Sequence, residues 1–423
     1  MMKEITKYIE ENKVNNGRLN VLLIAYACEP GRGSEPGTGW NMAMGLATRH
    51  DLTVATRANN RARIEDELQK VAPANPPRFL YIDPPQWTLR LKARGLMPIQ
   101  IFYYLWQREL ATWLRKANDN FDIIHQLTFN SFEVPPLDFF HLKGAKVWGP
   151  IGGGQTVPSE MLRAFGPGGS RSETLRNGRV RLSAKSPWVR RTLANADLVL
   201  FANNETHGLL APECKGKCEM MIDVGVDLRK FKPERKAKRS DQVTFLAAGR
   251  LEARKGIILL LESFAAFAKG HQGSDLRIVG DGPEMARIKQ AIAALGLSGR
   301  VILSGAVSHD AMQREFESAD VFVFPSLRDT SGAVVLEAMA MELPVICFDH
   351  QGTALMVPLD CGIRIPISSF DKTVALFRAA LTRMAGDTEL RRLYGSRGRQ
   401  VVASNYDWSV KVARIDKFYR EIS

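Results

Sequence analysis

The sequence predicts an α/β protein made of two doubly wound domains, each with a parallel sheet covered by helices on both faces. Two observations carry this prediction. Continuous apolar runs, which are typical of buried parallel strands, alternate with helical stretches along the chain. The alternation restarts after residue 222, where residues 222–234 carry Gly, Pro and charge with little periodicity and indicate a linker. Ligands of such folds bind at the carboxyl ends of the strands, so we expect a cleft between two sheets.

The first half of the chain supplies the first predicted sheet. Residues 20–27, NVLLIAYA, form a continuous apolar run, and a Gly/Pro-rich loop and a helix over residues 40–49 follow it. Further strands are predicted at residues 52–56, 79–82, 122–125, 145–148 and 198–201. Together these elements predict an N-terminal domain over residues 1–222.

The second half repeats the pattern. Its predicted strands lie at residues 243–248, 276–279, 301–304, 321–324 and 344–348, and helices are predicted at residues 256–267 and 283–295. These elements predict a C-terminal domain over residues 223–404. Residues 406–419 form an amphipathic pattern with aromatics, so we expect residues 405–423 to be a helix that packs back towards the N-terminal domain.

Composition limits the classes of partner. The 423 residues carry a net charge of +13, and both halves of the chain are basic. Such a charge attracts phosphorylated ligands, anionic lipid or nucleic acid. No basic recognition helix or aromatic stacking sheet is apparent, so we predict no nucleic-acid partner.

The N-terminal residues and the cysteines indicate the compartment. Residues 1–18 lack the apolar core of a signal peptide, and no window is apolar enough to span a membrane. The five cysteines are scattered and do not have zinc spacing. We therefore predict a cytoplasmic protein with reduced thiols and no metal.

Residues 325–345 hold the most informative pattern, with Asp329 and Glu337 on either side of a Thr-Ser-Gly turn. The run over residues 333–341 is apolar on every face except at Glu337, which is typical of a buried helix. A carboxylate there is costly unless it is paired. Sugar or ribose hydroxyls are suitable partners, and the N–H groups at the helix start can meet a phosphate. The alternative is that Glu337 pairs with a core Arg or caps a neighbouring loop.

Two cations follow the first strand of the second domain. Arg250 comes directly after Gly249, and Lys255 lies five positions later, in the loop that leads to a helix. A planar donor fork and a point charge together suit a diphosphate. A solvated basic loop is the alternative. Val307 lies in a later strand-end loop whose backbone suits a nucleobase, although an ordinary loop fits that segment equally well.

The first domain offers glycines and a histidine. Gly37, Thr38 and Gly39 are expected in a loop that approaches an anion, but Met42 stands where a dinucleotide fingerprint needs its third glycine. A hydride-transfer enzyme is therefore disfavoured. His125 ends a predicted strand and suits a sugar hydroxyl or a leaving oxygen. The alternative is a core histidine that bonds to backbone.

Over essentially the whole chain, these residues resemble the retaining nucleotide-sugar glycosyltransferases of family 4, which have the GT-B fold. The most specific blocks are G-R-L-x-x-x-K-G at residues 249–256 and the acidic pair followed by EAMA-x-x-x-PV at residues 329–345. The resemblance implies a donor-binding C-terminal domain and an α/β GT-B fold with a deep interdomain cleft.

The resemblance also implies roles for single residues. Arg250 and Lys255 would hold the donor diphosphate, Glu337 the ribose hydroxyls and Asp329 the transferred sugar. The family usually has Glu at the position of Asp329, so this residue departs from the pattern and suggests altered donor choice. The remaining implied contacts are His125 near the donor sugar, Gly37, Thr38 and Gly39 near the diphosphate, and Gly249, Val307 and the turn Ser331, Gly332, Ala333, Val334 along the donor.

The implied reaction is transfer of a hexose with retention, with no metal and no cofactor. The donor expected is a UDP-sugar, with GDP-mannose possible, and the acceptor a lipid-linked glycan or a surface-polysaccharide intermediate. Two alternatives stay open: a non-catalytic GT-B regulatory or binding subunit, which the Asp329 departure motivates, and a GT-B sugar-nucleotide epimerase.

The acceptor side carries basic residues beside aromatic ones. Residues 89–114 hold five aromatics together with Arg90, Lys92 and Arg94, and residues 161–192 hold eight basic residues against Glu173 alone. Such a surface suits an anionic membrane, so we expect peripheral contact with the cytosolic face of the inner membrane. The alternative is that the aromatics are core and the arginines a solvated face.

Overall fold

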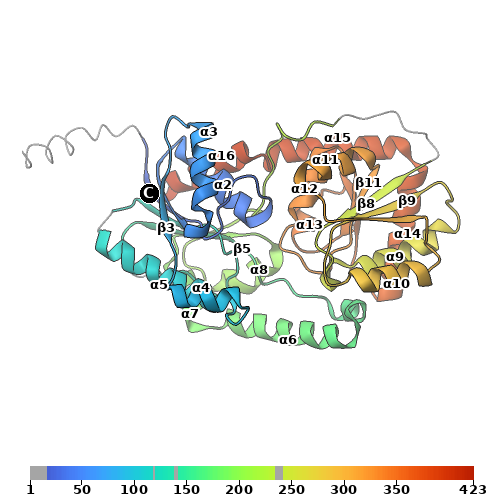
Figure 1. The fold of residues 1–423 in the computed structure, drawn as a ribbon, viewed down its shortest axis with the longest axis horizontal. Coiled ribbons are helices and arrows are strands. Elements are labelled where there is room, and N and C mark those ends of the chain that lie inside the picture. Colours follow the sequence, from blue (N-terminus) through green and yellow to red (C-terminus); the bar gives the residue numbers. More distant parts are fainter. Residues whose placement is uncertain (1–16, 118–119, 138–141, 234–241) are drawn as a thin grey trace, which may run out of the picture.

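The structure, a computed structural model, describes residues 17–117, 120–137, 142–233 and 242–423. Two parallel sheets lie side by side, with helices packed on their faces (Figure 1). The predicted fold class is therefore confirmed. Residues 1–18 were expected not to form a signal peptide, and residues 1–16 of this segment lie outside the described residues. Glu234, at the end of the predicted linker, also lies outside them.

The first sheet has seven parallel strands in the order β3-β2-β1-β4-β5-β6-β7. Its central strand β1 is apolar and buried from Val21 to Ile24. The edge strand β7 is short and half polar, which is why the sequence analysis missed it. The strands are β1 (Asn20–Ile24), β2 (Asp51–Arg57), β3 (Arg78–Ile82), β4 (Ile123–Gln126), β5 (Ala145–Ile151), β6 (Leu198–Phe201) and β7 (Lys217–Met220).

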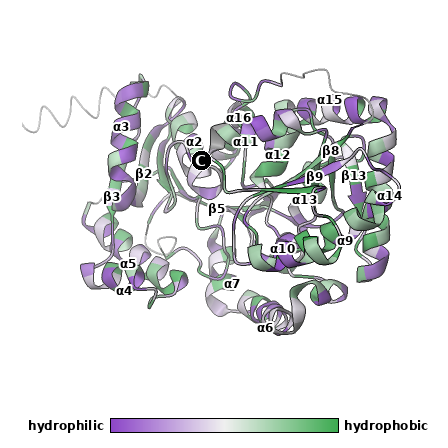
Figure 2. Cartoon of the chain, turned by 45° about the vertical axis from the view of Figure 1, so that its right-hand side comes forward, coloured by the Kyte–Doolittle hydropathy of each residue, from purple (hydrophilic) through white to green (hydrophobic). Residues whose placement is uncertain are grey.

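Helices cover both faces of this sheet. α3 is mostly hydrophilic, as Figure 2 shows, and buries only Ile64 among its residues. The α-helices of this half are α2 (Ser34–Ala47), α3 (Arg61–Val71), α4 (Gln86–Ala93), α5 (Ile99–Ala117), α6 (Gly166–Ala184), α7 (Pro187–Asn195) and α8 (Asn204–Leu210). Short 3-10 helices are η1 (Ala58–Asn60), η3 (Ser159–Phe165) and η4 (Ala211–Glu213).

The second sheet has six parallel strands in the order β10-β9-β8-β11-β12-β13. The last strand was not predicted, because GIRI follows a turn and carries an arginine. The strands are β8 (Thr244–Ala248), β9 (Asp275–Val279), β10 (Val301–Gly305), β11 (Val321–Phe324), β12 (Val345–Phe348) and β13 (Gly362–Ile365).

The helices of this half include the helix that carries Glu337. They are η5 (Ala253–Lys255), α9 (Ile257–Ala268), α10 (Met285–Ala294), α11 (His309–Ser318), α12 (Ala333–Ala340), α13 (Gln351–Met356), α14 (Phe370–Gly386), α15 (Thr388–Asn405) and α16 (Trp408–Ile422).

The last helix returns to the first half of the chain. α16 packs against α2, and Arg49 forms an ion pair of 2.8 Å with Asp416. Just before α16, Asp407 forms an isolated bridge with Val226, and Trp408 N–H donates to the Val226 carbonyl at 3.0 Å. The linker is thereby tied to the C-terminal helix.

One segment crosses in the opposite direction. Val157, Met161 and Phe165, which precede α6, pack into the hydrophobic core beneath the second sheet. A little further along, Glu173 of α6 accepts two hydrogen bonds from Arg328, at 2.9 and 3.1 Å. The predicted boundary at residue 222 separates the strands of the two sheets along the chain. In the folded structure, however, residues from before this boundary also pack into the hydrophobic core of the second sheet.

Candidate functional site

The carboxylate Glu337 lies on α12, whose start faces the region between the two sheets. Gly332 caps this helix with a φ of 93°, a left-handed conformation that glycine adopts without strain. A side chain there would also meet the Phe324 ring, since a Cβ atom would lie 2.9 Å from its Cζ atom. The turn before α12 therefore requires glycine, and it leaves the first N–H groups of the helix available to an anion.

The Glu337 carboxyl has no hydrogen-bond or ion-pair partner among the described residues. The surrounding protein removes water from the carboxyl and raises its pKa to about 7. It lines a cavity of about 60 Å³ together with Ala333, the linker residues Val224 and Gly225, and Gly37 of α2. The alternative that Glu337 pairs with a core Arg is therefore wrong for this structure.

Asp329 lies at the opposite side of the same turn, already paired. Lys255 donates to its Oδ2 atom, and Arg254 lies 3.5 Å from the same oxygen. The Asp329 N–H donates to Gln351 Oε1 at 2.7 Å. Two residues predicted to contact the donor thus contact each other, and a diphosphate would have to replace Asp329 as the partner of Lys255.

Arg250 presents the more open cation. Its side chain is 72% exposed, and its contact with Glu252 at 2.9 Å is the ion pair of a surface residue. Gly249, Arg250 and Lys255 line one small cavity at the end of β8. The structure therefore brings these three predicted residues together at the carboxyl edge of the second sheet.

The predicted glycine loop of the first domain needs correction. α2 begins at Ser34, six residues before the predicted helix start at Trp40, so Gly37, Thr38 and Gly39 lie inside the helix. A Cβ atom at Gly37 would lie 2.1 Å from the Arg32 carbonyl oxygen, and one at Gly39 would lie 2.1 Å from the Ala27 carbonyl oxygen. The glycines thus let helix and preceding loop approach closely. Gly37 nevertheless lines the cavity of Glu337.

His125 lies in β4, at the predicted strand end, but both of its ring nitrogens contact groups within the protein. The side chain is fully buried, its Nδ1 atom lies 2.6 Å from Tyr419 Oη, and its Nε2 atom lies 2.6 Å from the Gly149 carbonyl oxygen. Burial lowers its pKa to about 4, so the ring is neutral at pH 7. This is the core histidine of the alternative interpretation, and its nitrogens do not face the cleft.

The remaining predicted donor contacts have mixed surroundings. Val307 packs on the apolar cluster that includes Val335 and Phe322, so only its backbone is suited to a ligand. Ser331 is buried at the turn, and its side chain interacts with Asp223. Ala333 and Val334 occupy the first turn of α12.

The sequence analysis missed two carboxylates beside this turn, Glu35 and Asp223. Asn130 connects them, since its N–H donates to Glu35 Oε1 at 2.8 Å and its side-chain amide donates to Asp223 Oδ2 at 2.6 Å. Burial raises the pKa of both carboxyls, and the nearby Asp223 carboxylate raises the pKa of Glu35 further. The available signal was Glu35 itself, an acid in the Gly/Pro-rich segment after β1. Asp223 carried no signal, because it lies in the linker.

Several residues of the first half of the chain contact the second half at the turn that contains Thr330. Gln155 donates to Thr330 Oγ1 at 2.8 Å, and a Cβ atom at Gly152 would lie 2.6 Å from Thr330 Cγ2. Gln351 donates across to the Thr156 carbonyl at 3.0 Å. The glycine-rich segment after β5 therefore approaches the turn that precedes α12.

No group of three or more His, Cys, Asp or Glu with metal-binding geometry occurs in the described residues. What the site offers is an unpaired carboxyl for hydroxyl groups, helix N–H groups and two cations for phosphate, and further carboxyls on the facing side. This set suits binding and polarisation of an anionic, hydroxyl-rich ligand.

Residues 229–401 match the family model described as "Glycosyl transferases group 1". The chain is 27% identical over 201 residues to the alpha-D-kanosaminyltransferase of Streptomyces kanamyceticus, covering 47% of this chain and 51% of that protein. It is 25% identical over 251 residues to the phosphatidylinositol N-acetylglucosaminyltransferase GPI3 subunit of Saccharomyces cerevisiae, covering 56% and 54%. The chain thus spans about half the length of these relatives.

Solved structures show the same fold over more of the chain. Sucrose-phosphate synthase from Thermosynechococcus elongatus superposes with a TM-score of 0.67 at 18% identity, covering 96% of this chain and 99% of that one. Anabaena HepE in complex with UDP superposes with a TM-score of 0.60 at 16% identity, covering 95% and 100%. At these identities the likeness establishes the fold.

Proposed function

We propose that this chain, which belongs to the glycosyl transferases group 1 family and has the GT-B fold, is a nucleotide-sugar glycosyltransferase. The reaction is retaining transfer of a hexose from a nucleotide-diphosphate sugar, with a UDP-sugar favoured over GDP-mannose. The acceptor is a lipid-linked glycan or a surface-polysaccharide intermediate. Residues 1–222 bind the acceptor, residues 223–404 the donor, and residues 405–423 join the two.

One observation carries the proposal: the half-buried Glu337 side chain has no partner among the described residues and lines a cavity shared by α2 and α12. A carboxyl with a pKa raised to about 7 gains stability from any ligand whose hydroxyls donate to it. The 2′- and 3′-hydroxyls of a ribose supply two donors. HepE, which shares the fold, is solved with UDP, and this supports a uridine nucleotide.

The phosphates belong at the adjacent strand end. Arg250 and Lys255 neutralise the diphosphate charge that develops as the sugar leaves, and the N–H groups at the start of α12 add to this. Lys255 exchanges Asp329 for phosphate, which frees the Asp329 carboxylate for hydroxyls of the transferred sugar. The acceptor hydroxyl attacks from the face of the leaving group, so retention needs no protein nucleophile.

A thermal-shift screen across UDP-, GDP- and ADP-sugars tests the donor assignment. A ligand that binds the native state at 100 times its Kd stabilises the protein by about 2.7 kcal/mol. We expect a rise in Tm with a UDP-sugar and none with the Glu337→Ala variant. Absence of a shift with every nucleotide sugar contradicts the proposal.

Two other activities are distinguished by the products. Slow donor hydrolysis that occurs in the wild type and vanishes in Glu337→Ala excludes a non-catalytic binding subunit. Conversion of the donor sugar without release of the nucleotide, in the absence of acceptor, identifies an epimerase instead.

The lipid acceptor and the membrane contact rest on the outer helices of the first half. Trp87, Leu96, Ile101 and Trp188 of this region are each more than half exposed. α4, α5, α6 and α7 lie along the lower side of the molecule in Figure 1. The yeast relative is named for a phosphatidylinositol acceptor, which supports a lipid substrate. Among the described residues, no helix has the length and apolar composition needed to cross a bilayer.

We therefore place the enzyme on the cytosolic face of the inner membrane, held peripherally by aromatic and basic residues. Cell fractionation tests this placement: the protein should sediment with inner membranes at low salt and leave them in high salt. Protein that stays in the soluble fraction at every salt concentration contradicts it.

A further inference from the structure

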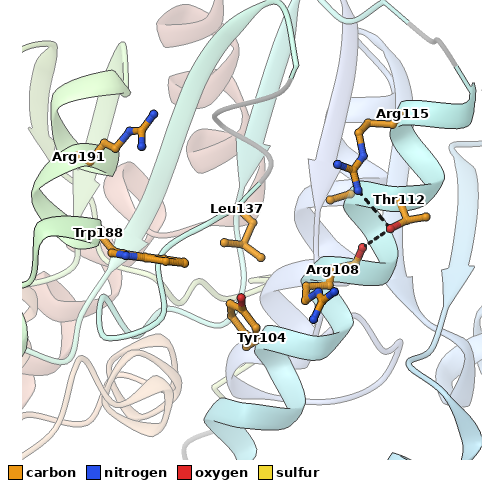
Figure 3. Close-up of a pocket in the computed structure, with 8 residues that line it drawn as sticks. Tyr104, Arg108, Thr112, Arg115, Leu137, Trp188 and Arg191 are labelled. Atoms are coloured by element: carbon orange, nitrogen blue, oxygen red, sulfur yellow. Dashed lines mark hydrogen bonds between the residues drawn. The ribbon is translucent and has the colours of Figure 1, made fainter.

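Polar groups from distant parts of the chain are arranged in two different ways. In the groove between α5 and α7, Arg108 and Arg115 extend from one wall and Arg191 from the other, so their guanidinium groups lie apart (Figure 3). At the contact of α13 with α8, by comparison, the backbone N–H, the side-chain carbonyl oxygen and the side-chain amide of Gln351 each have a partner within 3.0 Å. Gln351 is therefore fixed from three directions.

The partners of Gln351 come from both halves of the chain. Its side-chain carbonyl oxygen accepts a hydrogen bond from the Asp329 N–H at 2.7 Å. Its side-chain amide donates to the Thr156 carbonyl oxygen at 3.0 Å, and its backbone N–H donates to Glu205 Oε1 at 3.0 Å. Thr156 and Glu205 precede the linker, whereas Asp329 follows it. Gln351, which is buried, thus connects the backbone of Asp329 to two points of the first half.

The backbone of Gln351 has a conformation that is unfavourable for a residue with a side chain. Its φ is 56°, in the left-handed region, and such a conformation persists only where the surroundings hold it. The next residue is closely packed as well, since a Cβ atom at Gly352 would lie 2.1 Å from the Thr330 carbonyl oxygen. A glycine at position 351 would adopt this φ without strain. What the glutamine adds is its side chain, with the hydrogen bonds to Asp329 and Thr156.

The hydrogen bond from the Asp329 N–H differs from the contacts of the Asp329 carboxylate. Lys255 donates to that carboxylate, and in the proposed function Lys255 exchanges it for phosphate. The bond to Gln351 involves the backbone of Asp329, so it is compatible with this exchange. The carboxylate can then turn towards the sugar while its backbone stays fixed against the first half. Such a constraint is valuable, because a misplacement of about 1 Å can lower a rate about 100-fold.

We propose that Gln351 is a positioning residue, which holds Asp329 where its carboxylate meets the hydroxyls of the transferred sugar. Gln351 does not line the cavities at Glu337 and Arg250, so it acts through Asp329 and does not touch the donor itself. The proposal rests on the proposed function and adds to it a residue that fixes the sugar contact. Loss of Gln351 should therefore affect the sugar and leave the nucleotide unaffected.

The variant Gln351→Gly tests this role, because glycine keeps the backbone conformation and removes both side-chain hydrogen bonds. The probe is whichever of UDP-glucose, UDP-galactose and UDP-N-acetylglucosamine the wild type hydrolyses fastest. We expect kcat for its hydrolysis to fall about 10- to 100-fold, while the affinity for UDP alone changes less than about twofold. The Tm should stay within about 3 °C of the wild type, since relief of the left-handed φ offsets lost hydrogen bonds.

The matched control is Ala72→Gly, at the end of α3. Ala72 has a left-handed φ of 42°, so this variant relieves the same kind of backbone conformation away from the cleft. Its kcat should equal that of the wild type. If Gln351→Gly does not fold, Gln351→Met replaces it, because methionine keeps the length of the side chain and forms neither hydrogen bond. A wild-type kcat in the folded variant overturns the proposal.

A double-mutant cycle separates positioning from a purely structural role. Asp329→Asn weakens the sugar contact directly. If Gln351 acts through Asp329, adding Gln351→Gly to Asp329→Asn should lower kcat by less than about a further twofold. Two losses that multiply fully overturn the proposal, because Gln351 then acts independently of Asp329. A loss of UDP affinity in folded Gln351→Gly also overturns it, since the proposed function places the nucleotide at Glu337 and Arg250.

The wild type distinguishes failure of this inference from failure of the proposed function. If the wild type hydrolyses a nucleotide sugar and Gln351→Gly does so equally fast, only the role of Gln351 is contradicted. If the wild type hydrolyses no nucleotide sugar, the proposed function is contradicted, and the role of Gln351 is contradicted with it. Reduced hydrolysis in Gln351→Gly, with UDP affinity retained and no further loss in the double variant, supports both.

Discussion

The two sheets present very different edges to each other. At the edge of the second sheet, Arg250 and Lys255 line one cavity and Lys255 donates to Asp329, while the Glu337 carboxyl has no partner among the described residues. At the edge of the first sheet, His125 and Gly39 are committed to internal packing. The edge of the second sheet therefore keeps polar groups available for a ligand. At the edge of the first sheet, the corresponding residues contact other parts of the protein instead.

This difference indicates how the two halves divide their work. In the proposed function, the second half holds groups of fixed chemistry near one turn, where they would recognise a diphosphate and a ribose. The facing half contributes backbone and the carboxyls Glu35 and Asp223, which are linked through Asn130. Substitutions at the donor edge should change activity, and those at the facing edge should change stability.

The largest effect is expected from Arg250→Ala. Loss of a preorganised charge at the leaving group typically lowers kcat about 100- to 1,000-fold, and the exposed side chain contributes little to folding. Turnover with saturating donor and the Tm together give the measurement. Arg287→Ala on α10 removes another partly exposed arginine of the same half and should leave both unchanged. Unchanged turnover in Arg250→Ala contradicts the proposal that Arg250 binds the donor diphosphate.

Glu337→Gln should come next. The amide keeps the size of the side chain but accepts ribose hydroxyl bonds less strongly, so donor affinity should fall about 10- to 100-fold. Isothermal titration with the nucleotide sugar measures this change. Glu342→Gln, on the turn after α12, serves as the control, because it alters the charge without altering the cavity. Equal affinities for the donor in wild type and Glu337→Gln contradict the ribose assignment.

The same variant should make the ligand-free protein more stable in alkaline solution. Below the ordinary pKa of 4.5 the carboxyl is neutral in both the folded and the unfolded states, and no difference arises. Between about pH 4.5 and pH 7 the unfolded chain releases this proton while the folded protein retains it, so wild-type stability falls over this range and levels off above pH 7. A shift of this size corresponds to about 3 kcal/mol at pH 8. Urea unfolding at pH 5 and pH 8 measures the difference, and a Glu337→Gln curve parallel to the wild type contradicts it.

His125→Ala tests the facing edge. It leaves the Gly149 carbonyl and the Tyr419 hydroxyl without their partner and opens a void, so unfolding should become easier by about 2–4 kcal/mol. Turnover of the folded protein should change less than threefold. Tyr419→Phe removes one of the two bonds and should cost about 1 kcal/mol. Lost turnover with unchanged stability contradicts this structural role and indicates that His125 takes part in catalysis.

The sequence predicted what local pattern and chemistry determine. Of the thirteen strands in the part of the chain that the structure describes, eleven lie where apolar runs indicated them. The two missed strands, β7 and β13, are edge strands with polar or charged residues. At the donor edge, prediction succeeded because Gly249, Arg250 and Lys255 are consecutive along one strand-to-helix connection, so their proximity follows from the chain itself.

Prediction failed where long-range contacts decide. The role of His125 depends on Tyr419, which lies 294 residues away, and the position of Asp223 depends on Asn130. The helix start at Ser34 was missed because Gly37 and Gly39 normally weaken a helix, whereas here close backbone packing requires them. None of these contacts leaves a periodic signal in the sequence.

The smallest effect is expected where the two halves are joined rather than where they face each other. Arg328 of the donor half forms a two-pronged ion pair with Glu173 of α6, and both side chains are mostly buried. Because the contact is bidentate and shielded, Arg328→Ala should lower stability by about 1–3 kcal/mol, more than an exposed pair contributes. The exposed pair of Arg163 with Asp371 joins the same two regions at 3.4 Å, and Arg163→Ala is the matched control, expected to cost less than about 1 kcal/mol.

If the crossing segment also fixes the width of the cleft, Arg328→Ala should raise KM for the donor about two- to fivefold while kcat stays constant, since a looser cleft weakens binding before it weakens chemistry. A lowered kcat with unchanged KM would instead mean that Arg328 acts through its neighbour Asp329 on the transferred sugar, and the division between a chemical edge and a structural edge would then extend further along the turn.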